Sequence, residues 1–478
     1  MTGFGDDGGD GARGAPAGDL RQLFQSEDES FHQQMRLAAA AHRAGRLDEA
    51  IGGYLRLLTA RPYHAELHNN LGVALRLIGK LDAAVSHHRV SLALDAENAA
   101  LQSNLGNALR AANQLDEAVR HHFRAVTLRP DYAEGFFNLG LCLRDLGRID
   151  EALGCLTRAL ALAPENGRAR VEIAVARLMR GEFARGFADY EWRKRLDDVP
   201  PPEFRQPAWD GGDIAGRRVL LYPEQGLSDA LMFVRYARDL KRRGATVLVL
   251  CQALLKELLL RLDYVDTVVA EGEPLPEFDL HASLLSLPHL CGVDVPAAAA
   301  EEPYLRAPDE PRVKLGRLPR ARLRIGIYWA AMPGQQMDRQ RSAPFARFAG
   351  LAGDPEMLFF SLQGGAAQKD IQQAGANGLV HDVGRGIFDF AEAATALAQL
   401  DLLITVDAPI AHLAGGMGMP TWLLLPNVAD WRWMHGRDTS PWYPTLRLFR
   451  QSVPGEWSDV FERVRVELEA LKAVAPAE

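Results

Sequence analysis

The sequence predicts an α + α/β protein, in which an array of helical hairpins precedes two parallel α/β halves. A 34-residue period runs through the first third of the chain, and short β-rich segments alternate with helical patterns from about Arg217 onward. A Pro- and charge-rich stretch at residues 307–320 divides this alternation in two. Long periods indicate stacked helical repeats, and alternating strands and helices indicate parallel βαβ sheets. We expect a flexible leader, the repeat array and the two α/β halves at residues 1–30, 31–200, 215–310 and 321–478.

Composition excludes several classes of protein. The 478 residues are 47% hydrophobic and 24% charged, which argues against wholesale disorder and against a coiled-coil rod. The net charge of −8 lacks the basic footprint of a duplex-binding protein. No apolar run approaches the ~20 residues of a membrane span, and the glycine-rich start has no apolar core of a signal peptide. Four scattered cysteines give no disulfide framework, so we expect a soluble cytoplasmic protein with free thiols.

The repeat units align without gaps at residues 65–98, 99–132 and 133–166, with an earlier unit at 31–64 and a diverged fifth at 167–198. A Leu-Gly pair recurs at one phase and an alanine at another: Leu71-Gly72, Leu105-Gly106 and Leu139-Gly140, then Ala84, Ala118 and Ala152. Small residues belong where two helices cross closely, and prolines close the later units. The pattern resembles the tetratricopeptide repeat, which implies about five helical hairpins.

An asparagine ladder accompanies the repeats. Asn70, Asn104 and Asn138 each stand immediately before the Leu-Gly pair. Because an amide side chain is both donor and acceptor, such a ladder can hold the peptide groups of an extended chain. It is similar to the asparagine ladder of O-linked N-acetylglucosamine transferases, and we interpret it as an acceptor-binding surface. The alternative is that asparagine is simply frequent at this repeat position.

Two histidine pairs, His87-His88 and His121-His122, repeat at the same spacing of 34 residues. Stacked repeats can bring such pairs together around a metal ion. The favoured interpretation is that His88 and His122 replace the aromatic residue expected at that helix position, which is Tyr54 in the first unit.

The α/β halves contain nine expected strands. They lie at residues 219–222, 246–251, 267–270 and 278–281, then at 323–329, 358–363, 379–383, 402–406 and 421–425. Ligands of parallel sheets bind beyond the carboxyl ends of the strands. This rule places four polar or glycine-rich segments around one cleft: residues 224–229, 330–342, 363–365 and 407–412.

The motifs favour metal-free phosphate binding. No GxGxxG follows a strand, and the chain has neither a Walker motif nor an Asp-x-Asp. Backbone amides at a helix start are the remaining means of binding phosphate. Asp407-Ala408-Pro409 fits such a start, because proline is favoured in the first helical turn and His412 lies about one turn further. We expect no metal ion at this site.

Two pairs of segments carry a resemblance to a known family: EQGLSD at 224–229 with FVRY at 233–236, and ITVD at 404–407 with HLAG at 412–415. They resemble bacterial glycosyltransferases of family 9, the heptosyltransferase-like group. The C-terminal segments DWRW, SPWYP and RLFRQ, which begin at Asp430, Ser440 and Arg447, are similar to bacterial proteins that fuse tetratricopeptide repeats to such a domain. The resemblance covers nearly the whole chain from residue 31 onward.

The resemblance implies a GT-B glycosyltransferase with two Rossmann-like halves after the repeats. The donor nucleotide would lie on the C-terminal half, with a nucleotide-sugar as substrate and no further cofactor. Asp229 matches the aspartate regarded as the acceptor base, a role that suits a hydroxyl losing its proton during attack. The alternative for Asp229 is a helix N-cap.

The resemblance also implies a set of donor-binding residues. Asp407 and His412 match positions near the donor phosphates and sugar. Arg341 and Ser342 lie in the matching loop, where a cation and a hydroxyl offset the charge of the leaving diphosphate. Trp431 and Trp433 are placed beside a base or sugar. The alternative for both is hydrophobic packing of the C-terminal segment, which suits Trp433 at least as well. Gln363, Ala408 and Pro409 complete the expected donor set.

Several positions depart from the family pattern. Ser228 stands where glycine is usual, Ala408 replaces a threonine, and Pro409 replaces a small residue. Met332 and Met337 replace polar residues of the donor loop. These changes predict weaker donor binding or a different donor.

The function that the resemblance implies is protein glycosylation. Fused proteins of this layout resemble enzymes that modify flagellin in the cytoplasm before export. We therefore expect transfer of a sugar from a nucleotide-sugar to Ser or Thr of a polypeptide held by the repeats, with flagellin as acceptor and a nonulosonic acid, such as pseudaminic or legionaminic acid, as one candidate sugar. Two alternatives stay open: a repeat scaffold whose glycosyltransferase-like domain does not catalyse, and an enzyme that acts on a polysaccharide or lipid-linked saccharide.

Overall fold

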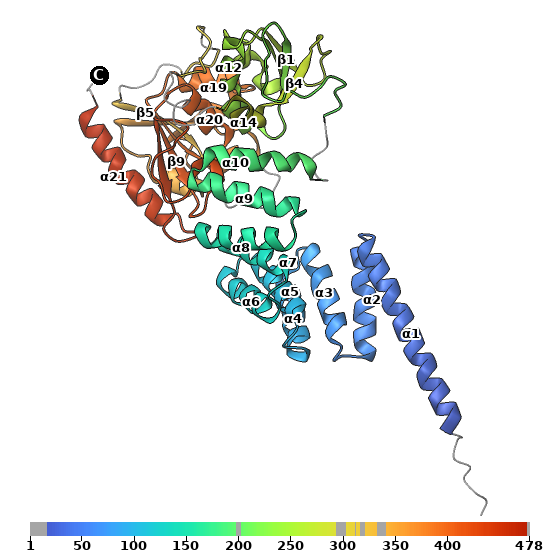
Figure 1. Ribbon diagram of the computed structural model, residues 1–478. Helices are drawn as coiled ribbons and strands as arrows, with labels where there is room; N and C mark the ends of the chain where they lie inside the picture. The colour runs from blue at the N-terminus through green and yellow to red at the C-terminus, as the bar shows by residue number, and fades with distance from the viewer. Residues whose placement is uncertain are drawn as a thin grey trace, which may run out of the picture. The chain divides into compact units, whose positions relative to one another are not determined.

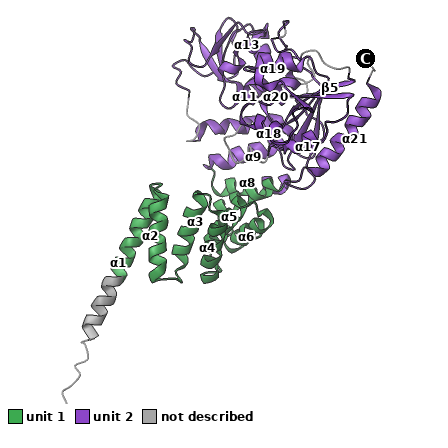
Figure 2. Cartoon of the chain, turned by 180° about the vertical axis from the view of Figure 1, so that it is seen from behind, with its two compact units in different colours: residues 1–146, 154–164 green, residues 147–153, 165–478 purple. Residues whose placement is uncertain are grey.

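The computed structural model describes residues 17–196, 202–292, 303–310, 312–315, 321–331 and 341–475, with side chains from residue 28 onward. The chain forms two compact units, Met1–Leu146 with Gly154–Pro164, and Gly147–Leu153 with Glu165–Glu478 (Figure 2). Helix α1 begins at Ala17, inside the segment expected to be a flexible leader. Residues 17–30 are therefore helical, and the remainder of the predicted leader lies outside the described residues.

The first unit consists of antiparallel helix pairs (Figure 1). Its helices are α1 Ala17–Arg43, α2 Leu47–Ala60, α3 Ala65–Leu77, α4 Leu81–Leu94, α5 Ala99–Ala111, α6 Leu115–Leu128 and α7 Ala133–Asp145, followed by α8 Ile149–Leu162. The three units predicted without gaps begin at the first residues of α3, α5 and α7. The period identified in the sequence is thus a helical hairpin, as expected.

The turn inside each hairpin requires a left-handed residue. Gly45, Gly79, Gly147 and Gly181 have φ between 74° and 83°, and Asn113 takes the same place with φ 58°. These positions are 34 residues apart, so the turn is part of the repeat. Glycine adopts this conformation without steric cost, and asparagine is the residue that most often replaces it.

The Leu-Gly pair marks the place where the two helices of a hairpin touch. A Cβ atom added to Gly72 would lie 2.7 Å from Nε2 of His88, and one added to Gly106 would lie 2.6 Å from Nε2 of His122. Both imidazoles are buried, and none of their ring nitrogens has a hydrogen-bond partner among the residues that the structure describes. His88 and His122 therefore fill the position of a packed aromatic ring, as the favoured interpretation states.

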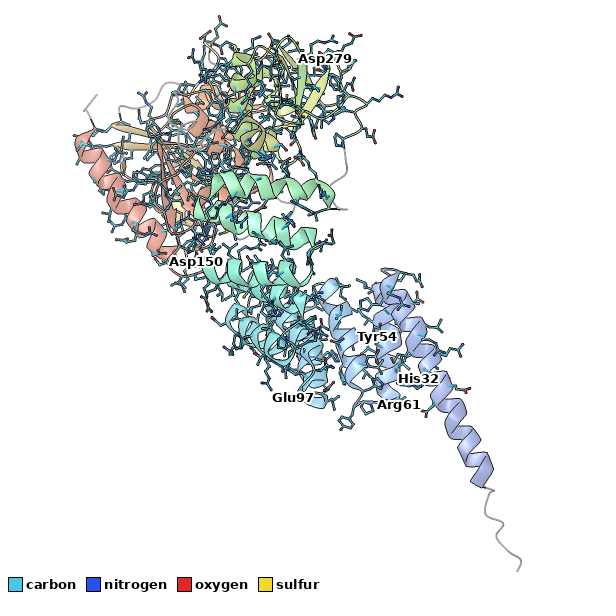
Figure 3. All side chains as sticks on the ribbon, viewed as in Figure 1. His32, Tyr54, Arg61, Glu97, Asp150 and Asp279 are labelled. Atoms are coloured by element: carbon cyan, nitrogen blue, oxygen red, sulfur yellow. The ribbon has the colours of Figure 1, made fainter. Side chains whose placement is uncertain are left out.

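In the first hairpin this ring position belongs to Tyr54 of α2, which is labelled in Figure 3 and is fully buried. Its hydroxyl lies 3.3 Å from Nδ1 of His42. His87, the neighbour of His88, instead stacks on His68, and their Nδ1 atoms are 2.9 Å apart. Among the residues that the structure describes, no three His, Cys, Asp or Glu side chains form a group that holds a metal ion.

The second unit contains, besides Gly147–Leu153, the last helical hairpin, α9 Gly167–Arg180 and α10 Phe183–Tyr190, which is followed by the short 3₁₀ helix η1 Glu191–Arg195. A four-stranded parallel sheet comes next, in the order β3-β2-β1-β4. Its strands are β1 Arg218–Tyr222, β2 Thr246–Cys251, β3 Thr267–Ala270 and β4 Leu280–Ser283. Helices α11 Leu227–Phe233, α12 Ala237–Arg242, α13 Lys256–Leu259 and α14 Leu287–Cys291 and 3₁₀ helices η2 Val234–Tyr236, η3 Ala253–Leu255 and η4 Leu284–Ser286 accompany these strands.

A six-stranded parallel sheet completes the chain, in the order β10-β9-β8-β5-β6-β7. Its strands are β5 Leu323–Tyr328, β6 Met357–Ser361, β7 Val380–Asp382, β8 Leu402–Val406, β9 Thr421–Leu425 and β10 Leu446–Arg450. The helices of this half are α17 Phe345–Ala349, α18 Lys369–Gln373, α19 Phe390–Leu397, α20 Pro409–Gly416 and α21 Ser458–Val474. The short 3₁₀ helices here are η5 Gly365–Gln368, η6 Gly384–Gly386 and η7 Trp431–Trp433.

Two differences from the expected strands have local causes. β4 begins two residues later than expected, because the carboxylate of Asp279 accepts a hydrogen bond from the backbone N–H of Arg218 (2.8 Å) at the start of the pairing. β10 was not expected as a strand, although its residues were recognised as a motif. It pairs with β9 and alternates exposed Arg447 with buried Leu446 and Leu448.

The strand orders locate the crevices where ligands bind. Both sheets place the first strand beside the fourth. In the larger sheet the connection after β5 leads to β6 and the connection after β8 leads to β9, in opposite directions. A crevice forms at the carboxyl ends of such neighbours. The segments that follow β5 and β8 therefore define the candidate site of the larger sheet. Within the described residues, no helix combines the length and apolar character that a membrane crossing requires.

The buried histidines of the repeats predict a dependence of stability on pH. Burial, helped by the charge of Arg76, lowers the pKa of His88 to about 4, and burial with Arg110 lowers the pKa of His122 to about 3. The unfolded chain binds protons near pH 6.5, where the folded repeats do not, so stability falls as pH drops below that value. We expect a loss of about 2 kcal/mol for each histidine between pH 7 and pH 5.

The measurement compares melting temperatures of the full chain at pH 7 and pH 5, for the wild type and for the double variant His88→Phe/His122→Phe. Phenylalanine keeps a ring against Gly72 and Gly106 but binds no proton. The double variant is expected to lose much less stability on acidification than the wild type. An equal loss in both proteins would show that these histidines do not cause the pH dependence.

Candidate functional site

The segment after β8 places a buried carboxylate at the start of a helix. Asp407 follows the strand directly, Ala408 is the N-cap of α20, and Pro409 is its first residue. Oδ2 of Asp407 lies 3.5 Å from Nη1 of Arg341, which comes from the segment after β5. Burial and the nearby Asp430 carboxylate raise the pKa of Asp407, and Arg341 opposes this shift. The structure thus brings Asp407, Ala408, Pro409 and Arg341 together, as the sequence predicts.

Asp229 belongs to a buried ion pair. It lies in the first turn of α11 and accepts hydrogen bonds from Nε (2.9 Å) and Nη2 of Arg432, which belongs to η7 in the other α/β half. Nη1 of Arg432 donates to Asp430 (2.8 Å). Burial raises the pKa of Asp229 and the Arg432 guanidinium opposes it, whereas the pKa of Asp430 is lowered because Arg432 outweighs burial. One guanidinium therefore joins carboxylates from both halves.

The N-cap alternative for Asp229 is wrong. The N-cap of α11 is Gly226, three residues earlier, and the Asp229 side chain is directed to Arg432. Asp229 lies in the segment that follows β1, where the sequence analysis places an acceptor base. Its carboxylate, however, already accepts hydrogen bonds from a guanidinium.

His412 does not face the crevice as expected. It lies in the second turn of α20, where its Nδ1 shares a 2.9 Å hydrogen bond with the hydroxyl of Tyr443. Its ring is 4.9 Å from that of Trp433, and its Nε2 has no hydrogen-bond partner within the described part of the chain. Burial lowers the pKa of His412 to about 3, so the imidazole is neutral. Pro409 and His412 lie three residues apart in α20, and the side chain of His412 is directed into the core whereas Pro409 lines the crevice.

Trp431 is likewise a core residue, and the prediction that it flanks a base or sugar is wrong. Only 4% of Trp431 is exposed. Its ring lies 5.7 Å from that of Phe187 in α10 and 6.5 Å from that of Phe233 in α11, and Trp442 completes the cluster. Packing against three aromatic side chains uses the surface that a ligand would need. Trp433 is fully buried, which favours the packing alternative for this residue.

Gln363 and Ser342 hold the two ends of the loop that follows β5, which the sequence analysis expects to contact a donor. Oε1 of Gln363 accepts hydrogen bonds from the backbone N–H groups of Trp329 (3.1 Å) and Ala330 (3.0 Å). The hydroxyl of Ser342 accepts one from the N–H of Ala331 (3.1 Å). Both side chains therefore position loop backbone instead of presenting their polar groups to a ligand. Met332 and Met337 lie in this loop, outside the described residues.

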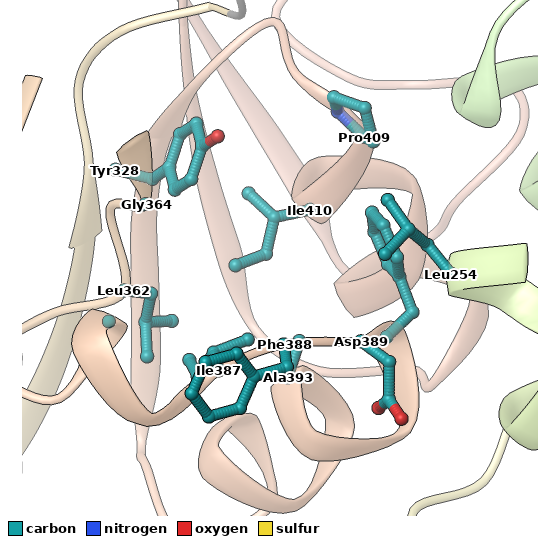
Figure 4. Close-up of a pocket in the computed structure, with 12 residues that line it drawn as sticks. Leu254, Tyr328, Leu362, Gly364, Ile387, Phe388, Asp389, Ala393, Pro409 and Ile410 are labelled. Atoms are coloured by element: carbon teal, nitrogen blue, oxygen red, sulfur yellow. The ribbon is translucent and has the colours of Figure 1, made fainter. Parts of the chain in front are cut away.

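An apolar pocket of about 140 Å³ opens at the carboxyl ends of β5 to β8 (Figure 4). Tyr328, Leu362 and Ile410 line it together with residues that follow β7, and Leu254 of η3 reaches it from the smaller sheet. This volume is close to that of a cavity that holds benzene. The pocket therefore has the size for one planar ring, whose faces its apolar lining would contact.

Phe388 stands at the mouth of this pocket with 75% of its surface exposed. Its backbone N–H donates to the carboxylate of Glu392 (2.6 Å), and Asp389 caps α19 by accepting from the N–H of Glu392 (2.7 Å). These reciprocal bonds fix the backbone of the pocket edge. An exposed aromatic ring at an apolar pocket is well suited to stack on a planar ligand.

The asparagine ladder joins neighbouring repeats. The amide of Asn104 donates to Oδ1 of Asn69 (2.9 Å), and that of Asn138 donates to the hydroxyl of Ser103 (3.2 Å). Asn70 accepts a long hydrogen bond from Asn69 (3.5 Å). Part of the hydrogen-bonding capacity of the ladder is thus used between repeats. Within the described part of the chain, the side-chain oxygens of Asn104 and Asn138 accept no protein hydrogen bond, and binding of a peptide there stays a prediction.

Two functional features were missed in the sequence. Arg432 belongs to the DWRW motif, but the sequence analysis predicted no role for it. A charged residue between two tryptophans is a signal of a buried ion pair. Arg193 gave no such signal. Its guanidinium is buried beside the carboxyl ends of β1 and β4, where Nη2 donates to Glu224 (2.5 Å) and to Ser286 (2.8 Å), and Nη1 to Glu191 (2.8 Å). Arg193 belongs to η1, directly after the last repeat hairpin, and its side chain occupies the crevice of the smaller sheet.

The comparisons with known proteins bear mainly on the repeats. The tetratricopeptide repeat family model matches residues 97–165, which confirms the repeats. The chain is 26% identical over 332 residues to protein FlbA of Caulobacter vibrioides, an alignment that covers 62% of this chain and 54% of FlbA. The chain thus spans about half the length of this curated relative.

Solved structures with similar segments include MamA (TM-score 0.30, 24% identity, 33% of this chain and 92% of MamA). PilF of Pseudomonas aeruginosa has a TM-score of 0.33 at 23% identity, over 36% of this chain and 78% of that chain. YrrB, described as a repeat protein with an unusual peptide-binding site, has a TM-score of 0.31 at 20% identity, over 37% of this chain and 92% of its own.

The buried ion pair predicts strong coupling between Asp229 and Arg432. Removing one partner leaves the other charge buried, so Asp229→Ala or Arg432→Ala is expected to cost about 3–5 kcal/mol of unfolding free energy. The double variant should cost less than the sum of the two, by at least ~1 kcal/mol. Denaturant unfolding measures all three, and Glu462→Ala in the exposed pair with Arg465 is the control, with no measurable change expected. Additive single effects would contradict the pair.

A pair of glycines tests the shape of the pocket edge. A Cβ atom on Gly384, which lines the pocket, would lie 2.2 Å from the backbone oxygen of Gln363. Gly386, two residues further, has open space at the same point. Gly384→Ala is therefore expected to lower the melting temperature by several degrees, whereas Gly386→Ala leaves it nearly unchanged. Equal melting temperatures for the two variants would refute the close contact.

Proposed function

We propose that the protein is a metal-independent glycosyltransferase of the GT-B type that transfers a sugar from a nucleotide-sugar to Ser or Thr of a protein. The observation that carries the proposal is the apolar pocket at the carboxyl ends of β5 to β8, directly beside the start of α20. Pro409 and Ile410 belong to both the pocket and the helix start. A ring in the pocket would therefore have its attached groups next to the N-terminus of α20.

The helix start supports the phosphate part of the donor. Ala408 has no side chain that caps α20, and the positive end of the helix dipole favours an anion there. Arg341, with 31% of its side chain exposed, adds a positive charge beside Asp407. A nucleobase in the pocket, stacked against Phe388, and phosphates at the helix start account for the two chemical parts of a nucleotide.

The transfer itself needs a base and a leaving group. The acceptor oxygen forms a bond to the anomeric carbon while the bond from that carbon to the nucleotide phosphate breaks. The hydroxyl proton passes to a carboxylate, for which Asp229 is the candidate, and the nucleotide leaves with the electron pair. Helix α20 and Arg341 would stabilise the negative charge that develops on the leaving phosphate.

The protein acceptor is proposed on the basis of the repeats. Tetratricopeptide repeats present concave surfaces that bind polypeptides, and the ladder Asn70, Asn104 and Asn138 offers side-chain oxygens that accept backbone N–H groups. Flagellin as the acceptor and a nonulosonic acid as the sugar rest on the resemblance to flagellin-modifying enzymes. The repeats would select the polypeptide, and the α/β halves would supply the chemistry.

A pocket-filling substitution tests the donor site. Gly364 lines the pocket in an extended conformation, and a Cβ atom there meets open space. Gly364→Leu is thus expected to fill the pocket without disturbing the fold, and Gly386→Leu, which also meets open space, is the control outside the pocket lining. Melting curves with millimolar UDP, GDP, CMP or ADP should show stabilisation of the wild type and of Gly386→Leu by one nucleotide, and none for Gly364→Leu.

The transfer reaction is measured by the intact mass of flagellin that is produced together with the protein and the sugar donor. We expect a mass increase of whole sugar residues on Ser or Thr, which is absent with Gly364→Leu. If none of the four nucleotides stabilises the wild type and flagellin gains no mass, the proposal fails and a scaffold without catalysis explains the chain better.

A further inference from the structure

We propose that Arg432 acts as a latch on the base of the reaction: an anionic donor nucleotide competes with Asp229 for the Arg432 guanidinium and so releases the Asp229 carboxylate. This inference rests on the proposed function, because it needs a nucleotide at the crevice of the larger sheet. Donor binding would then be a condition for activation of the acceptor hydroxyl.

The first support is the geometry of the guanidinium. Nε and Nη2 of Arg432 both donate to Oδ1 of Asp229, and Nη1 donates to Oδ1 of Asp430. All three nitrogens are thus engaged, two of them by the carboxylate from the smaller sheet. The plane of Arg432 also lies over the ring of Trp431, with 4.3 Å between its Cζ and the ring centre. Trp431 therefore holds the guanidinium at this position. The two carboxylates that Arg432 contacts differ in burial, since Asp229 is buried and Asp430 is partly exposed.

The second support is the state of Asp229. A base must accept a hydrogen bond from the hydroxyl that it deprotonates. Here the carboxylate accepts from a cation, and this ion pair stabilises the charged form and makes the group a weaker base. Burial alone raises the pKa of Asp229, so withdrawal of the cation leaves a carboxylate with greater proton affinity. The release of Arg432 would therefore convert Asp229 from an ion-pair partner into a base.

The third support is an open side to the cluster. Asp229 and Arg432 are buried, but Asp430 and Arg341 have 33% and 31% of their side chains exposed. Asp407 lies beside Arg341 at the start of α20, and its pKa responds to Arg432 as well. Trp433 of η7 also packs on His412 of α20, with 4.9 Å between the ring centres, so the segment that carries Arg432 lies against the helix that would hold the phosphate. Phosphate oxygens are strong, bidentate acceptors for arginine and can replace a carboxylate.

The charges of the cluster favour competition between a phosphate and Asp229 for Arg432. Three carboxylates, Asp229, Asp407 and Asp430, face two guanidiniums, Arg341 and Arg432, so the unliganded cluster carries more negative than positive groups. An incoming phosphate adds negative charge and gains full benefit from Arg432 only when the bonds to Asp229 are broken. In the wild type, part of the donor's binding free energy is therefore used to break this pair.

The test is calorimetric titration of the full chain with whichever of UDP, GDP, CMP and ADP stabilises it. Asp229→Asn keeps the size of the side chain but removes its charge, so we expect the nucleotide to bind about tenfold more tightly, a gain of ~1.4 kcal/mol. A residue that serves only as a base would leave nucleotide affinity unchanged. The matched control is Asp189→Asn, which neutralises the partner of Arg177 in the α9–α10 hairpin and is expected to bind like the wild type.

A second variant assigns the gain to Arg432. Arg432→Gln introduced into Asp229→Asn is expected to abolish the tighter binding. If Asp229→Asn does not fold, Asp430→Asn releases the same guanidinium from its second carboxylate and carries the same expectation. Equal or weaker binding by a folded Asp229→Asn protein overturns the latch alone, with the proposed donor site intact. Absence of binding by any of the proteins overturns the proposed function, and the latch with it.

Discussion

The guanidinium of Arg432 is the point on which the arrangement of the two α/β halves depends. It reaches from η7 of the larger sheet to Asp229 in the first turn of α11, and both side chains are buried. A buried charge is tolerated only when its partners satisfy it, so α11 must lie where Asp229 meets Arg432. Arg235 repeats this principle nearby, since it donates to the backbone oxygen of Trp442 (3.0 Å) and to the hydroxyl of Tyr304 (3.0 Å).

The same contacts explain why the aromatic residues of the C-terminal segment are structural. Trp431 packs between α10, α11 and Trp442, and this packing connects the last hairpin of the repeats with the α/β halves inside one compact unit. Arg193 adds a polar connection, because it extends from η1 into the crevice of the smaller sheet. The unit is thus built around arginines that cross between elements, each surrounded by carboxylates or aromatic rings.

The sequence predicted those features that repeat or alternate. The 34-residue period located the starts of α3, α5 and α7, and the β-rich runs located four strands to the residue, β2, β3, β8 and β9. Strand order then placed Asp407 and Arg341 at one edge, as observed. The direction of single side chains was not predictable in this way. His412 and Trp431 were assigned to a ligand, but helical phase and aromatic packing turn both into the core. The pairing of Asp229 with Arg432 joins residues 203 positions apart, which no local pattern indicates.

The central claim is that the carboxyl edge of the larger sheet holds a donor nucleotide. Hydrogen–deuterium exchange of the full chain, with and without the stabilising nucleotide, tests this claim most directly because it locates the ligand on the chain. We expect slower exchange in the segments that line the pocket, at residues 362–365, 384–390 and 407–412, and unchanged exchange in the repeat helices. Protection confined to the repeats, or to the smaller sheet, would contradict it.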